Sequence, residues 1–97
     1  NGVLHVLQNG YNQKLSGDVI LVPNPSTIAS SSRKGTTHGS GYSYDTHIPM
    51  IFYGNGIKQG VSKKKYEIVD IAPTISNLLQ IEFPNGCSGK IIEEVLE

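Results

Sequence analysis

The sequence predicts an α/β fold in which a mixed or parallel β-sheet is flanked by helices. Two apolar runs, residues 19–22 and 48–53, are typical of strands covered on both faces, because their apolar residues are consecutive rather than alternating. Helical periodicity precedes and follows them, and alternating strand and helix signals are characteristic of α/β proteins. Two strong strands are few for a complete sheet, so we expect these 97 residues to form part of a larger one.

The first expected element is a short helix over residues 3–11, since its apolar residues have helical spacing and reach an Asn-Gly pair. A Ser-Gly-Asp turn at residues 16–18 leads into the first strand, which two prolines end. Residues 26–43 are dense in Ser, Thr and Gly and predict a long loop. Loops of that length tend to be functional or disordered. The second strand then ends at a Gly-Asn-Gly turn, residues 54–56.

Two more helices are expected after the second strand. Asp70 is a candidate N-cap for a helix over residues 70–81, with Pro73 in the first turn, where the N–H that proline lacks has no intrahelical partner. Ser88 is a candidate cap for a last short helix over residues 90–97. The longer of the two helices carries its large apolar residues on one stripe: Ile71, Ile75, Leu78 and Leu79.

Composition excludes several classes of protein. Lys+Arg and Asp+Glu number 8 each, whereas a sequence-independent nucleic-acid binder usually carries a basic surplus. No apolar run is long enough to span a bilayer, and the single cysteine, Cys87, excludes an internal disulfide framework. The length allows one compact domain at most. Because the chain begins with neither Met nor a signal-peptide core, we expect a processed protein or a piece of a longer one.

The segment that carries chemistry is residues 35–53. His38 lies there in a polar loop ahead of the second strand, and Gly35 and Gly39 leave the backbone around it free to approach a ligand. A lone loop histidine is, by itself, more often exposed or hydrogen-bonded than metal-bound. Ser40, His38 and Asp45 superficially suggest a hydrolase triad, but the Gly-x-Ser-x-Gly elbow is missing and triads are defined by spatial geometry.

Five blocks in one order cover almost the whole chain, and together they carry a resemblance that a single Thr-His-Gly would not. The chain resembles the alkaline phosphatase superfamily, specifically the large bacterial zinc-dependent phosphomonoesterases of the phosphodiesterase/nucleotide-pyrophosphatase type. The resemblance identifies residues 1–97 as a C-terminal fragment of such a catalytic domain. The blocks are Ser16-Gly17-Asp18, GTTHGS (35–40), YDTHIPMIFYG (44–54), YEIVDIAPTISNLLQI (66–81) and PNGCSGKIIEEVL (84–96).

The resemblance implies a zinc-dependent phosphate-ester hydrolase that works through a covalent phospho-enzyme and two zinc ions. His38 matches the family's histidine ligand of the zinc that faces the leaving-group oxygen. That zinc's other ligands, the nucleophile and the ligands of the second zinc lie outside this sequence. We therefore expect one metal ligand and no catalytic residue here, incomplete zinc binding and no activity by the fragment alone.

Two neighbouring residues have a structural and a functional interpretation. Because the family's ligand is the earlier histidine, we interpret His47 as structural or as supporting a ligand. Asp45 either accepts a hydrogen bond that orients His38 or His47, or caps the turn before the strand. Two alternatives for the whole protein also stay open, namely a phosphodiesterase or nucleotide pyrophosphatase of the same superfamily, and a non-catalytic α/β domain that binds a partner or metal.

Expected partners and location follow from the same analysis. The resemblance implies a phosphate-ester substrate for the whole protein and export to the periplasm, while composition predicts neither nucleic-acid binding nor a membrane span. In the fragment the two strands would lack neighbours, which leaves a strand edge and an apolar face uncovered. We therefore expect the fragment to self-associate.

Overall fold

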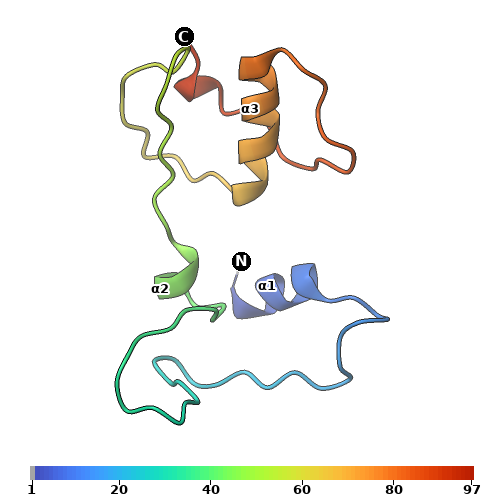
Figure 1. Cartoon of the computed structure of the whole chain (residues 1–97). Coiled ribbons are helices and arrows are strands. Elements are labelled where there is room, and N and C mark those ends of the chain that lie inside the picture. The colour runs from blue at the N-terminus through green and yellow to red at the C-terminus, as the bar shows by residue number, and fades with distance from the viewer. Residues whose placement is uncertain (1) are drawn as a thin grey trace. The chain divides into compact units, whose positions relative to one another are not determined.

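The structure is a computed structural model that describes residues 2–97. The chain folds as two units, one ending at Pro49 and the other spanning Met50–Glu97. The first unit contains helices α1 (Val3–Gly10) and α2 (Ser43–Thr46) (Figure 1). The second contains a 3₁₀ turn η1 (Ile68–Asp70), helix α3 (Ile71–Leu79) and a 3₁₀ turn η2 (Glu93–Val95). The other described residues form turns, bends and irregular segments.

Helix α1 confirms the helix expected near the start of the chain. It ends where the Asn-Gly pair predicted a stop, and the N–H of Tyr11 then donates to the carbonyl of Gln8 at 3.3 Å. Gly41 passes close to the beginning of this helix, since a Cβ at Gly41 would lie 3.3 Å from the Cα of Val3. A glycine is therefore needed for the loop to return against α1.

The two expected strands are not strands in this structure, so the predicted sheet is unconfirmed. Residues 19–22 and 48–53 are irregular, and within residues 2–97 the one ladder-like pairing outside helices is an isolated antiparallel bridge between Ile57 and Leu96. A strand requires a neighbouring strand with which to exchange hydrogen bonds. Leu21 and Ile51 are 89% and 85% exposed, so these segments keep the apolar character of buried strands without the neighbours that would cover them.

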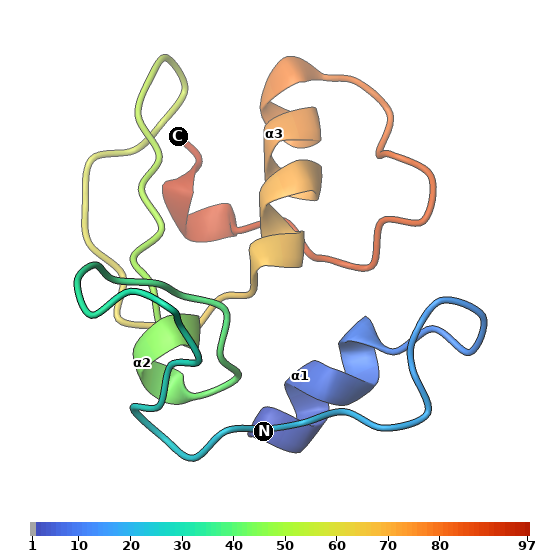
Figure 2. The ribbon, with the colours of Figure 1, turned by 60° about the horizontal axis from the view of Figure 1, so that its bottom comes forward.

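Helix α3 confirms the expected helix over residues 70–81, and Pro73 lies in its first turn as predicted. The helix begins after Asp70 and ends at Gln80, whose φ of 54° is left-handed. Its buried residues are Pro73, Thr74 and Ser76, and Thr74 contacts the C-terminal segment, which runs beside α3 in Figures 1 and 2. The buried aliphatic residue of that segment, Ile92, is 2% exposed.

The predicted helix over residues 90–97 is wrong, and Ser88 caps nothing helical there. Only η2 forms, since Ile92 has φ −86° and ψ 86°, outside the helical region, and the residues before η2 are bound to side chains near the start of α3. The N–H of Lys90 donates to a carboxylate oxygen of Asp70 at 2.8 Å, and the N–H of Ile92 donates to the hydroxyl of Thr74 at 2.9 Å. After η2, Leu96 pairs with Ile57 in the antiparallel bridge. The side chains of Asp70 and Thr74 therefore bind the start of this segment, and the bridge to Ile57 binds its end, in non-helical conformations.

Much apolar surface of the chain stays uncovered. The accessible surface is 9033 Å², whereas a compact protein of 10.5 kDa exposes about 5,400 Å². Helix α3 contributes to the excess, because Ile75 and Leu79 of its predicted apolar stripe are exposed while Thr74 and Ser76 are buried. Two residues of the apolar stripe are therefore exposed, while Ile71 and Leu78 are half-buried and the side chain of Leu78 lies close to Gly56.

Candidate functional site

His38 lies on an exposed stretch of the loop in the first unit. The glycines near it, Gly35 and Gly39, have φ values of 111° and 113°, a region that residues with a Cβ rarely adopt. The hydroxyl of Thr37 donates to the carbonyl of His38 at 3.3 Å. Residues 35–40 are irregular, with glycines at positive φ on both sides of the histidine, and the His38 side chain lies at the surface.

Asp45 holds the turn that follows His38. Its carboxylate accepts a hydrogen bond from the backbone N–H of Ser40 at 2.9 Å. Hydrogen bonds from Ser40 are the main cause that lowers the pKa of Asp45, and the nearby charge of His38 contributes in the same direction. The carboxylate is therefore bound to the turn rather than to an imidazole, and it stays ionised at neutral pH.

His47 follows α2 directly. Its backbone N–H donates to the carbonyl of Ser43 at 2.9 Å and ends that short helix. The imidazole itself is exposed, and among residues 2–97 it forms no hydrogen bond. Of the candidate residues, Asp45 thus lies in α2 and binds the backbone two residues after His38, while His47 ends the same helix.

Two tyrosines of this site were missed by the sequence analysis. The rings of Tyr42 and Tyr44 stack with centroids 5.8 Å apart and planes 18° apart. The hydroxyl of Tyr42 donates to the carbonyl of Pro23 at 2.9 Å, and the hydroxyl of Tyr44 accepts from the N–H of Ser26 at 3.0 Å. The available signal was a Tyr-x-Tyr pair within a segment of otherwise small polar residues. These rings, together with α1, line a cavity of about 100 Å³.

The chemistry of the donors fits zinc only in part. A neutral imidazole is a good zinc ligand, and His38 is exposed on a loop with a glycine at positive φ on either side of it. Zinc in a catalytic site needs three protein ligands, however, and across residues 2–97 no three His, Cys, Asp or Glu side chains come together as a metal-binding group. His38 would therefore act with donors supplied by other parts of a protein.

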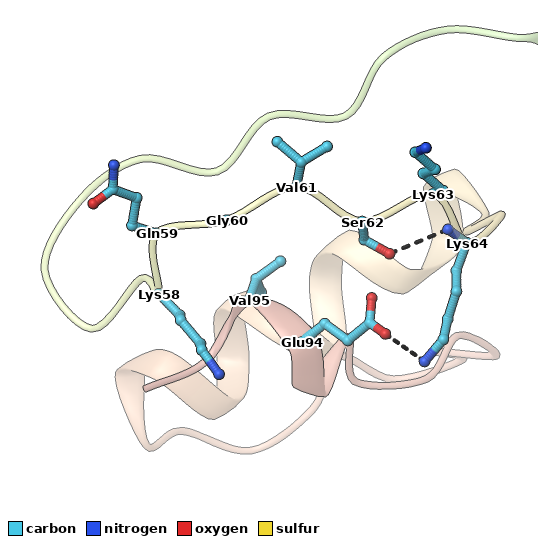
Figure 3. A pocket seen from close by; sticks show the side chains of 9 residues that line it. All are labelled: Lys58, Gln59, Gly60, Val61, Ser62, Lys63, Lys64, Glu94 and Val95. Atoms are coloured by element: carbon cyan, nitrogen blue, oxygen red, sulfur yellow. Dashed lines mark hydrogen bonds and ion pairs between the residues drawn. The ribbon is translucent and has the colours of Figure 1, made fainter.

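A second concave region, of about 550 Å³, lies in the Met50–Glu97 unit between residues 58–64 and η2 (Figure 3). Its charged groups are bound to one another: Lys64 forms an ion pair with Glu94, and the hydroxyl of Tyr66 donates to the same carboxylate at 2.7 Å. The ion pair with Lys64 is the main cause that lowers the pKa of Glu94 to about 2. This cluster ties the 58–66 segment to η2, and we assign it a structural role.

Comparison with known proteins gives strong matches over nearly all of the chain. It is 52% identical over 88 residues to the alkaline phosphatase PafA of Elizabethkingia meningoseptica, an alignment that covers 91% of this chain and 16% of that protein. It is 43% identical over 89 residues to the alkaline phosphatase PhoV of Synechococcus elongatus, which covers 92% of this chain and 16% of PhoV. A Myroides odoratus protein named a calcium-transporting ATPase is 50% identical over 90 residues, or 92% of this chain and 16% of that protein. No protein-family model matches the chain.

The fold agrees with the sequence comparison. The crystal structure of wild-type alkaline phosphatase PafA matches this structure with a TM-score of 0.84 and 51% identity, over 93% of this chain and 17% of that one. Sequence and structure together define an alkaline-phosphatase-like segment. The chain resembles one segment of these proteins, as its ordered sequence blocks indicated, and it spans about one sixth (16%) of the length of the relatives named above. No helix within residues 2–97 has the length and apolar character needed to cross a membrane.

Proposed function

We propose that the longer protein to which this segment belongs is a phosphomonoesterase of the alkaline phosphatase type. The observation that carries the proposal is the 52% identity to an alkaline phosphatase over 91% of this chain, supported by a TM-score of 0.84 for the matching structure. The residues of this chain form the C-terminal part of the catalytic domain. The reaction uses two zinc ions and passes through a covalent phospho-enzyme on a nucleophile outside this segment.

His38 is the residue of this segment that holds a zinc ion. When bound, that zinc supplies positive charge against the leaving-group oxygen of the phosphate ester. The chain's own contribution is to present the imidazole from an exposed loop, with Gly35 and Gly39 at positive φ. Ligands from elsewhere in the protein complete the site, since a catalytic zinc needs three.

Asp45 and His47 support this loop rather than bind metal. The ionised Asp45 accepts from the N–H of Ser40 and so fixes the backbone two residues after the histidine. It has no proton to donate at neutral pH, which argues against a role as a general acid. His47 ends α2 through its backbone N–H, and we assign its imidazole a role in stability or in orienting a ligand rather than in binding metal.

Two further proposals concern the setting of this protein. We propose export to the periplasm, since relatives of this type are named alkaline phosphatases and the family resemblance implies export. We also propose that the isolated 97-residue chain self-associates through its exposed apolar segments, because contact between apolar side chains and water is unfavourable.

The test is activity of the purified full-length protein against three probes: p-nitrophenyl phosphate, bis-p-nitrophenyl phosphate and ATP. We expect fastest turnover of the monoester, loss of that activity after chelation with EDTA, and recovery on adding zinc but not calcium. Faster turnover of the diester would contradict the monoesterase in favour of a phosphodiesterase. Turnover of ATP alone would contradict it in favour of the activity named for the Myroides odoratus relative.

A further inference from the structure

The loop that carries His38 is closed at its base by two tyrosine hydroxyls. We call the hydrogen-bonded ends of this loop its base: the loop begins at Ser26 and ends after Gly39. On the outgoing side, Pro23 offers its carbonyl to the hydroxyl of Tyr42 at 2.9 Å. On the same side, Ser26 donates its N–H to the hydroxyl of Tyr44 at 3.0 Å. Both bonds join residues 18 or 19 positions apart in the sequence.

The tyrosines are themselves held in place, which makes them suitable anchors. Their rings stack at 5.8 Å, and the carbonyl of Tyr42 accepts from the N–H of Asp45 at 2.9 Å and of Thr46 at 3.0 Å. The N–H of Tyr42 contacts the hydroxyl of Ser40 at 3.4 Å, so the anchor connects directly to the turn after His38. Each tyrosine therefore links the start of the loop, residues 23–26, to the compact segment 40–46.

The backbone at the anchored position is unusual. Ser26 has a φ of 61°, and it is one of two non-glycine residues with positive φ in residues 2–97. A residue with a side chain adopts this conformation rarely, and only where its surroundings stabilise it. The hydrogen bond from the N–H of Ser26 to Tyr44 is the contact that the structure provides there.

We propose that Tyr42 and Tyr44 are positioning residues for His38, an inference that rests on the proposed role of His38 as a metal ligand. With its base closed, the loop samples fewer conformations, and less entropy is lost when the imidazole is fixed on a metal. The hydroxyl groups carry this effect, because the stacked rings remain when they are removed. Neither tyrosine touches the metal or the substrate.

The test is the rate at which a colorimetric chelator, 4-(2-pyridylazo)resorcinol, removes zinc from the full-length protein. We expect Tyr42→Phe and Tyr44→Phe each to release zinc about fivefold faster, the factor expected from the loss of one ordinary hydrogen bond. The double variant should release it faster than either. Tyr11→Phe is the matched control, since Tyr11 is an exposed tyrosine of the same unit whose hydroxyl forms no hydrogen bond in residues 2–97.

A second measurement separates positioning from general damage. Activity is titrated with zinc: a positioning role shifts the midpoint of the curve to higher zinc while the plateau stays at the wild-type value. A lowered plateau, or zinc release as slow as in Tyr11→Phe, overturns the inference. His38→Ala is measured alongside. If that variant loses zinc while the tyrosine variants behave as wild type, only this inference fails, whereas full zinc and activity in His38→Ala overturn the proposed role of His38 as well.

Discussion

The hydroxyl of Thr74 connects helix α3 to the C-terminal segment through Ile92. It donates to the carbonyl of Asp70 at 2.6 Å and accepts from the N–H of Ile92 at 2.9 Å. Thr74 is fully buried and Ile92 nearly so, so the bond is shielded from water. One hydroxyl therefore satisfies a buried N–H and at the same time orients the residue that forms the small core of this unit.

Replacing Thr74 with valine should destabilise the Met50–Glu97 unit. Valine has the shape of threonine but leaves the N–H of Ile92 buried without a partner, at a cost of about 1–3 kcal/mol. Thr74→Ser is the control, since it keeps the hydroxyl. Amide hydrogen exchange at Ile92 measures the effect, and we expect faster exchange in the valine variant than in the serine one. Equal exchange rates in the two variants would show that the hydrogen bond contributes nothing.

The contact between Asp70 and Lys90 should depend on pH. The carboxylate of Asp70 accepts from the N–H of Glu67 at 2.9 Å and of Lys90 at 2.8 Å, and these bonds, that from Glu67 first, lower its pKa. The unfolded value is about 3.9, so the stabilisation is present above that pH and is lost as pH falls through the lower, folded value. We expect the amide resonance of Lys90 to shift in this acidic range.

Asp70→Asn provides the control for this titration. Its single amide oxygen can accept one of the two hydrogen bonds and does not titrate, so the acidic transition at Lys90 should disappear. A transition that persists in Asp70→Asn would assign it to another group. Close backbone approach is also required here, because a Cβ on Gly89 would lie 2.0 Å from the carbonyl oxygen of Val69.

Local sequence signals predicted the helices that depend on local interactions. The helical spacing and the stop signal predicted α1, and the position of Pro73 predicted the start of α3. The last helix was predicted wrongly because its first residues are held in a non-helical backbone by side chains far away in the sequence, those of Asp70 and Thr74. Tertiary hydrogen bonds override helical periodicity in such a short segment, and no pattern within residues 90–97 reveals them.

The candidate site could be predicted only in part for a similar reason. The glycines near His38 indicated a backbone free to approach a ligand, and both have positive φ. The anchoring of that loop by Tyr42 and Tyr44 joins residues 18 or 19 positions apart, and side-chain hydrogen bonds over such distances leave no periodic signal. Nor could the strand partners of residues 19–22 and 48–53 be predicted, since strand pairing depends on residues outside the segment itself.

Replacing His38 with alanine in the full-length protein should lower phosphatase activity by orders of magnitude and reduce the zinc content. His47→Ala is the comparison, with a loss of roughly 10–100-fold at most, since that residue acts through the position of its neighbours. Metal analysis and activity of both variants check the prediction. Loss of zinc from His47→Ala, with both metals kept in His38→Ala, would reverse the assignment of the ligand.

The 97-residue chain alone should hydrolyse no phosphate ester above background, even with added zinc. It brings no three metal-binding side chains together within residues 2–97, so the charge stabilisation that phosphoryl transfer requires is not assembled. The measurement is release of p-nitrophenol from p-nitrophenyl phosphate by purified chain, with a mock purification as the control for contaminating phosphatase. Zinc-dependent turnover above that control would contradict the prediction.

The isolated chain should self-associate as its concentration rises. Its apolar segments remain uncovered: Val19 is 80% exposed and Tyr53 99%, and the surface of 9033 Å² far exceeds the roughly 5,400 Å² of a compact protein of this mass. Unpaired backbone in these segments offers hydrogen bonds to another copy, and apolar burial adds to the attraction.

Size-exclusion chromatography with light scattering measures the mass. Leu21→Lys combined with Ile51→Lys should shift it toward the monomer, whereas Leu15→Lys, an equally exposed leucine outside these segments, should not. A monomeric mass for the unmodified chain at high concentration would refute association, and an equal effect of Leu15→Lys would show that it does not run through these two segments.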